Sequence, residues 1–186
     1  MHVKDASLGK GKAKLAIVSA HLPHPESTAT GRCLLAWCEG AIALGQELEV
    51  WTWGKSRLNI SPASLPPWCK YEPFDAPGGA RWREHLHSLF SPRSGITKAG
   101  WRPPDGAVAV ADDQESCPAV VPFDRSVATI QHRAVADAIA MSHLSPSALQ
   151  WSRAEHRAAR RAALTLVQSQ RVAKFLRGHV RVVPIS

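Results

Sequence analysis

The chain has 186 residues, enough for one domain of ordinary size and too few for two substantial ones. Its composition is 45% apolar and 20% charged, with 12 Gly and 14 Pro, which excludes a disordered or collagen-like chain and indicates a buried core. No apolar run reaches the ~18–20 residues of a membrane span, and no signal-peptide pattern follows the basic start, so we expect a cytoplasmic protein.

The net charge of +8 is concentrated at the two ends of the chain. Residues 1–14 carry four lysines against one aspartate, and residues 150–186 carry eight basic residues against Glu155 alone. The stretch between them carries 11 basic and 13 acidic residues. We therefore predict a basic tail over 1–13 and one domain over 14–186. Because the charge is terminal, the total alone does not indicate a nucleic-acid partner.

The predicted elements alternate between strands and helices along the chain. Strands are predicted at 14–20, 48–53, near 70–74, and at 105–113, 126–132, 164–169 and 180–184. Helices are predicted at 32–45, 79–90 and 170–178, with only a brief helix or a turn between Pro118 and Pro122. Gly45 suits the C-terminal cap of the first helix. Ser152 and Glu155 form an S-x-x-E capping box, which predicts that another helix begins there.

The strands are short and continuously apolar, as strands buried on both faces are. We therefore predict an α/β fold, a single Rossmann-like domain with a mostly parallel sheet and helices on both faces. Trp37, Trp51 and Trp53 fall within predicted core elements, whereas Trp68, Trp101 and Trp151 lie in Pro-rich or loop contexts and are candidates for exposed stacking surfaces.

Ligands of open parallel sheets bind outside the carboxyl ends of the strands. Three segments of this sequence follow such ends: the loop from His21 to Gly31, the acidic run 112–115, and Gln131 with His132 and Arg133. Gly31 stands at the expected start of a helix, where the absence of a side chain lets a ligand approach backbone N–H groups.

Metal chemistry is weakly indicated. His21 and His24 form H-x-x-H without a third ligand, and Asp112 with Asp113 suits a polar strand end better than a divalent-cation site. The four cysteines show neither zinc-ribbon spacing nor the density of a disulfide scaffold, so we expect reduced thiols. We predict no metal and no bound cofactor.

A basic stripe lies near the C-terminus. Its arginines stand at i, i+4, i+7 and i+8 of a predicted helix and are Arg153, Arg157, Arg160 and Arg161. The simplest interpretation is a solvated helix face. The functional alternatives are contact with an anionic membrane surface or with a nucleic-acid backbone.

One resemblance covers most of the chain. The run KLAIVSAHLPHPESTATGR, followed by LLAWCEGAIALGQELEVWTW, contains a strand, a Pro-containing loop ending in Gly-Arg, a helix and a second strand. SVATIQH, RAEHRAARRAALTLVQSQRVAKFL and VRVVP follow in order. These segments resemble the N-terminal domain of family-4-like glycosyltransferases of the two-Rossmann-domain, GT-B type. The chain departs from that pattern at Gln46, Leu164, Thr165, Ile185 and Ser186.

The resemblance implies transfer of a sugar from a nucleotide-sugar donor, a co-substrate, to a hydroxyl acceptor. It assigns a catalytic role to His132 and a substrate contact to Gly31, and Arg32, His21 and Asp112 complete the predicted substrate-binding set. In the family the donor site lies in a second Rossmann domain. We therefore expect a missing or separately encoded partner half, and little activity from this chain alone.

Two expectations about partners follow from the charge distribution. Peripheral contact with an anionic membrane at its inner face is compatible with the basic C-terminus, and nucleic acid is not the expected partner. The alternative to a transferase is a non-enzymatic α/β binding module that contacts nucleic acid or an anionic membrane through its basic C-terminal helices.

Overall fold

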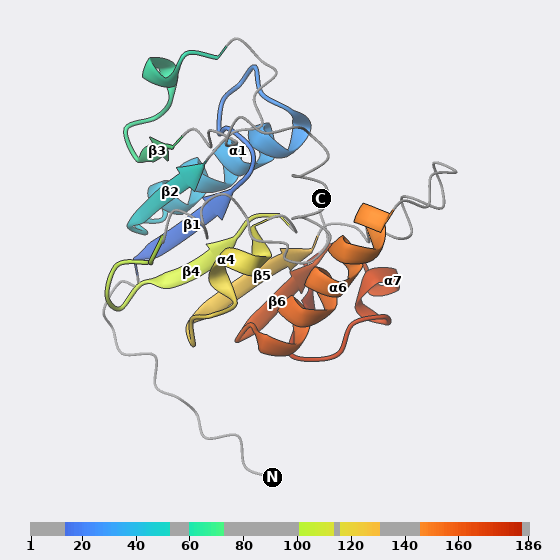
Figure 1. Ribbon diagram of the computed structural model, residues 1–186. Helices are drawn as coiled ribbons and strands as arrows, with labels where there is room; N and C mark the ends of the chain where they lie inside the picture. The colour runs from blue at the N-terminus through green and yellow to red at the C-terminus, as the bar shows by residue number, and fades with distance from the viewer. Residues whose placement is uncertain (1–13, 53–59, 73–100, 114–115, 131–145, 184–186) are drawn as a thin grey trace.

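Seven parallel strands form one sheet in the computed structural model, which describes residues 14–52, 60–72, 101–113, 116–130 and 146–183 (Figure 1). The strands are β1 (Leu15–Ser19), β2 (Leu48–Thr52), β3 (Cys69–Tyr71), β4 (Val108–Ala111), β5 (Ser126–Ile130), β6 (Leu164–Val167) and β7 (Val180–Val182). Their order across the sheet is β3-β2-β1-β4-β5-β6-β7. The predicted α/β, Rossmann-like fold is confirmed, and each predicted strand overlaps an observed one.

Helices cover both faces of the sheet, as predicted. They are α1 (Ala29–Ala43), α4 (Cys117–Val120), α6 (Pro146–Arg161) and α7 (Gln170–Ala173), with a short 3-10 turn η1 (Pro62–Ser64). On one face Leu34 and Cys38 of α1 pack with Ile17 and Val50. On the other, α4 and α6 pack over the C-terminal half of the sheet, as Figure 1 shows.

Burial on both faces of the sheet explains why the central strands are continuously apolar. In β1, Ile17 belongs to the core under α1, whereas Val18 belongs to the core under α4 and α6. Both side chains have no solvent exposure. Because successive side chains of a strand point to opposite faces, a strand covered on both sides has no position for a polar residue until it ends.

The ends of α1 follow from individual residues. Thr28 is the N-cap, and its hydroxyl accepts a hydrogen bond from the Gly31 N–H, so the helix starts earlier than the predicted residue 32. At the other end Gly45 has φ +74°. Its N–H donates to the Ile42 carbonyl and the next N–H, of Gln46, donates to Ala41. This is a Schellman motif, so the predicted cap at Gly45 is confirmed.

The predicted capping box at the head of α6 is wrong. The helix begins at Pro146, six residues before Ser152, so both box residues lie inside it. Proline fits the first helical turn because its missing N–H is not needed there, and it is the start signal in this segment. Glu155 is fully buried, on the face of α6 that packs on the sheet.

Tryptophan burial also differs from the predictions. Trp37 was predicted to lie in the core, but it is on the outer face of α1 and is 49% exposed. Trp68 and Trp101 instead pack against the two core clusters, and Trp101 makes an edge-to-face contact with Phe123 at 5.9 Å between ring centroids. Neither of these two rings forms an exposed stacking surface.

Two predicted segments lie outside the described residues: the basic tail 1–13 and the helix 79–90. Within the described ranges, no helix is both long enough and apolar enough to cross a membrane.

The strand order reverses beside β1. From β1 the chain moves outward to β2 and β3, and it then returns to the opposite side of β1 with β4. The carboxyl ends of β1 and β4 therefore border the topological switch point, where the connections on either side lead away from each other. This is the position at which ligands of doubly wound folds bind.

Candidate functional site

Polar side chains from β1 and β4 meet at the switch point. The two strands are paired in register, with Val18 opposite Ala111, so one further residue brings Ser19 to Asp112. The Ser19 hydroxyl donates a hydrogen bond of 3.1 Å to Asp112 Oδ2. The same hydroxyl oxygen accepts the backbone N–H of His21 at 3.0 Å. Ser19 thus joins two of the predicted binding residues, His21 and Asp112, into one hydrogen-bonded chain.

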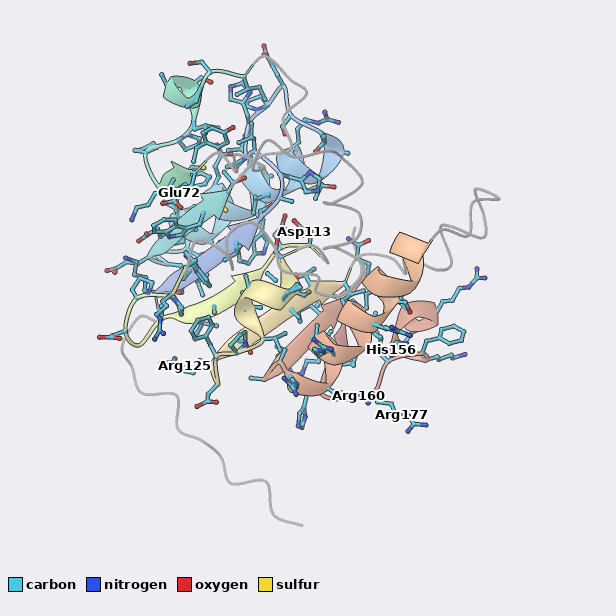
Figure 2. The ribbon with its side chains drawn as sticks, viewed as in Figure 1. Glu72, Asp113, Arg125, His156, Arg160 and Arg177 are labelled. Carbon is cyan, nitrogen blue, oxygen red and sulfur yellow. The ribbon has the colours of Figure 1, made fainter. Side chains whose placement is uncertain are left out.

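Asp113 is a structural strut beside this pair. Its Oδ2 accepts the backbone N–H of Ala20 at 2.9 Å, and its Oδ1 accepts the backbone N–H of Ser116 at 2.7 Å and the Ser116 hydroxyl at 2.9 Å. The carboxylate therefore ties the end of β1 to the start of α4. Both of its oxygens accept hydrogen bonds from backbone N–H groups. Figure 2 labels the Asp113 side chain.

Asp112 has the electrostatic character of a proton-transfer group. Burial and the neighbouring charge of Asp113 raise the pKa of its carboxyl from 3.8 to about 7, against the opposing effect of the Ser19 hydrogen bond. A carboxyl with such a pKa exchanges a proton near neutral pH, as a general acid or base must. Of the two adjacent aspartates, Asp112 is therefore the candidate for chemistry and Asp113 the residue that holds the strand ends in place.

Hydrogen bonds to Thr52 and Thr28 fix the loop between β1 and α1. The Thr52 hydroxyl, at the end of β2, donates to the His21 carbonyl at 3.1 Å. The His21 ring is held by a 3.2 Å contact between its Nδ1 and the Thr28 hydroxyl. Because Thr28 also caps α1, the imidazole lies beside the N-terminus of that helix. The partial positive charge of a helix N-terminus favours an anionic or electron-rich group at this position.

Gly31 has a packing role. A Cβ at this position would lie 2.3 Å from the Leu22 carbonyl oxygen and 2.3 Å from the Ser27 hydroxyl oxygen. Its own N–H is bonded to Thr28. The absence of a side chain therefore lets α1 approach its preceding loop. The assignment of Gly31 to substrate binding stays a prediction.

Arg32 braces the same loop from the other side. Its Nη1 donates to the Ser27 carbonyl at 2.8 Å, while the residue as a whole is exposed.

His132, the predicted catalytic residue, lies outside the described residues, and its role also stays a prediction. Sequence reasoning missed Ser19 as a site residue, although one signal was available. It is the polar residue that ends an otherwise apolar strand.

The cysteines are not candidates for the chemistry of this site, although the buried Cys117 Sγ donates to the Asp113 carbonyl at 3.4 Å. All four are free thiols, and only Cys33 is exposed. Burial, reinforced by the charge of Asp112, raises the pKa of the Cys38 thiol to about 12, and burial raises that of Cys69 to about 12. Such thiols stay protonated and unreactive at neutral pH. Among the residues that the structure describes, no three His, Cys, Asp or Glu side chains gather as metal ligands would.

Comparison with known proteins shows a distant likeness to a solved structure. No protein-family model and no curated protein sequence matches the chain. Among solved structures, the chain is similar to a UDP-glucosyltransferase from Polygonum tinctorium capable of glucosylating indoxyl, solved in complex with 3,4-dichloroaniline. The identity is 13%, the TM-score is 0.47, and the alignment covers 95% of this chain and 53% of the other. The chain thus spans about half the length of that neighbour.

Proposed function

We propose that this chain is the acceptor-side Rossmann domain of a GT-B-type glycosyltransferase, which transfers a sugar from a nucleotide-sugar donor to a hydroxyl acceptor. Two features support the proposal: the sequence resemblance, which runs in order along most of the chain, and the seven-stranded parallel sheet. The observation that carries it is the Asp112 carboxyl, with a pKa of about 7, at the switch point of the sheet.

The chemistry of sugar transfer needs a base at such a position. The acceptor oxygen forms a bond to the anomeric carbon of the donor while the bond from that carbon to the nucleoside diphosphate breaks. The acceptor also loses its hydroxyl proton, which Asp112 takes up in this proposal. The Ser19 hydroxyl orients the carboxylate through Oδ2. A carboxylate with a raised pKa is the stronger base for this step.

The remaining predicted residues take positioning roles. His21 and Arg32, on the loop and first turn of α1, lie where they could bind the acceptor or the phosphates of the donor. His132 polarises a reacting group, as the resemblance implies. We also propose that transfer requires a second, donor-binding Rossmann domain, because the resemblance assigns the nucleotide-sugar site to that half.

The test is a transfer assay with the chain co-expressed with the protein encoded immediately downstream of it. Release of nucleoside diphosphate is measured with UDP-, GDP- and ADP-linked hexoses and a panel of hydroxyl acceptors. We expect turnover with one donor, and a fall of about 10²–10⁴-fold in kcat for Asp112→Asn. The matched control is Asp105→Asn, which removes an exposed aspartate before β4 and leaves kcat unchanged.

Each result of this assay bears on a separate part of the proposal. Full turnover by Asp112→Asn refutes the role of Asp112 as base. Full turnover by the purified chain alone refutes the need for a second domain. No turnover with any donor refutes the transferase assignment and leaves the non-enzymatic binding module, which predicts no functional effect at Asp112.

A further inference from the structure

A strongly basic surface covers the outer side of α6 and α7. Between residues 146 and 183 the only acidic residue is Glu155, and it is fully buried. Eight cations of this stretch are exposed, and one of them, Arg181, lies on β7. The other seven lie on α6, on α7 or between α7 and β7: Arg153, Arg157, Arg160, Arg161, Arg171, Lys174 and Arg177. None of the seven forms an ion pair with another residue in the part of the chain that the structure describes. We call these seven residues the C-terminal basic surface.

The surface is continuous because its elements pack on one face of the sheet. Ala158 and Ala159 of α6, Ala162 directly after α6 and Leu176 after α7 belong to the same core cluster. The chain at Gly178 also lies directly against the last turn of α6, where an added Cβ would come within 1.8 Å of the Ala159 carbonyl oxygen. Arg177 is therefore next to the end of α6, and Figure 2 shows it toward the same end of the molecule as Arg160.

An exposed aromatic residue lies within this surface. Phe175 is 56% exposed and directly follows Lys174 in the sequence. A large apolar side chain among solvated cations is unfavourable in water and favourable at a lipid–water interface, where its ring enters the acyl boundary while long basic side chains reach the headgroups. A nucleic-acid backbone matches the cations equally well but does not require the exposed apolar ring.

We propose that the C-terminal basic surface docks the protein on the surface of an anionic phospholipid bilayer, with Phe175 inserted between the headgroups. The charge of this surface complements anionic headgroups, because its seven cations are exposed and residues 146–183 contain no exposed carboxylate. This surface belongs to the helix layer, so docking leaves the carboxyl ends of β1 and β4, with Ser19 and Asp112, uncovered by the bilayer. The inference does not rest on the proposed transferase function.

The experiment measures binding of the full chain to vesicles by co-sedimentation. One set of vesicles is phosphatidylcholine alone, and the other contains about one third phosphatidylserine. We expect binding to the anionic vesicles alone, and its loss when salt rises from about 0.05 M to about 0.5 M. Equal binding to both vesicle types, or binding that is indifferent to salt, overturns the proposal.

Two pairs of variants locate the docking surface. Each basic residue near an anionic surface contributes about fivefold in affinity, so Arg157→Gln with Arg160→Gln weakens binding about 25-fold. The control, Arg102→Gln with Arg125→Gln, removes two exposed charges outside this surface and changes binding less than about twofold. Phe175→Ala weakens binding about tenfold, while Trp37→Ala removes an exposed aromatic residue on the opposite face of the sheet and has no effect. The proposal is wrong if the control pair weakens binding as much as the test pair.

Competition with duplex DNA decides between the two anionic partners. If random-sequence DNA binds more tightly than the anionic vesicles at the same salt, and Phe175→Ala leaves vesicle binding unchanged, the surface is a nucleic-acid face and the membrane proposal fails. If DNA fails to displace the vesicles, the proposal stands. Far-UV circular dichroism of each variant establishes that it is folded, and the salt dependence of the wild type tests the proposal without any substitution.

Discussion

The glycines of α1 offer a prediction in which one substitution has opposite effects at two positions of one helix. At Gly31 an alanine Cβ would lie 2.3 Å from both the Leu22 carbonyl oxygen and the Ser27 hydroxyl oxygen. At Gly40 a Cβ would have no neighbour within 4 Å. Gly31→Ala therefore forces the helix away from its loop, whereas Gly40→Ala adds a methyl group in open space.

The magnitudes follow from the two environments. Overpacking costs about 1–3 kcal/mol, and the gain in helix propensity from Gly to Ala is at most about 1 kcal/mol. We expect Gly31→Ala to lower the free energy of unfolding by about 1–2 kcal/mol, because a backbone carbonyl cannot move aside as a flexible side chain can. Gly40→Ala should raise it by about 0.5–1 kcal/mol.

Urea denaturation followed by far-UV circular dichroism measures both free energies, and thermal melting gives a second reading. For a domain of this size 1 kcal/mol corresponds to about 2–4 °C, so the melting temperatures of the two variants should differ by about 3–12 °C. A Gly31→Ala variant that is as stable as the wild type would refute the argument that close packing of α1 on its loop requires glycine. So would a shift of both variants in the same direction.

Three further predictions concern the strand ends and the turn before β7. Asp112→Asn should raise the free energy of unfolding by about 1–3 kcal/mol above pH 7 and leave it unchanged below about pH 4. The reason is the raised pKa of Asp112, because ionising its carboxyl destabilises the folded protein increasingly as pH rises from 3.8 to about 7. Melting curves across this range that show no pH-dependent difference would contradict the prediction. Asp113→Asn should lower the free energy of unfolding by about 2–3 kcal/mol at neutral pH. The backbone N–H groups of Ala20 and Ser116 donate to both carboxylate oxygens, and an amide retains only one acceptor oxygen. An unchanged urea midpoint would refute the structural role of Asp113. Gly178→Ala should lower stability by about 2 kcal/mol or more, since φ is +133° and the added Cβ would lie 1.8 Å from a carbonyl oxygen; a melting temperature equal to that of the wild type would contradict it.

The strands were predictable because their sequences carry a local signal. A strand buried on both faces, such as Leu15–Ser19, requires a short apolar run, and each such run stops where the strand reaches solvent. The helix end at Gly45 was predictable for a similar local reason, since a left-handed residue with φ +74° favours glycine.

The start of α6 was predicted wrongly because its segment contains two helix start signals, a proline and a capping box. Ser152 and Glu155 satisfy the capping-box pattern, yet α6 already starts at Pro146. A capping box stabilises a helix start only where the chain is not already helical, and the pattern of four residues cannot report what lies before it. The burial of Glu155 and the exposure of Trp37 likewise depend on which face of each helix meets the sheet.

By itself, the sequence determined the alternation of strands and helices, the parallel α/β class and the terminal location of the positive charge, because hydrophobic period and charge are properties of short segments. It also indicated Asp112 and His21 as polar residues at strand ends. Only the tertiary structure decided that Ser19 bonds to Asp112, 93 residues away, and that Asp113 is a strut. The physical reason is that the pKa of a carboxyl and the partners of its oxygens depend on which strands pair, and strand order is set by packing of the whole sheet.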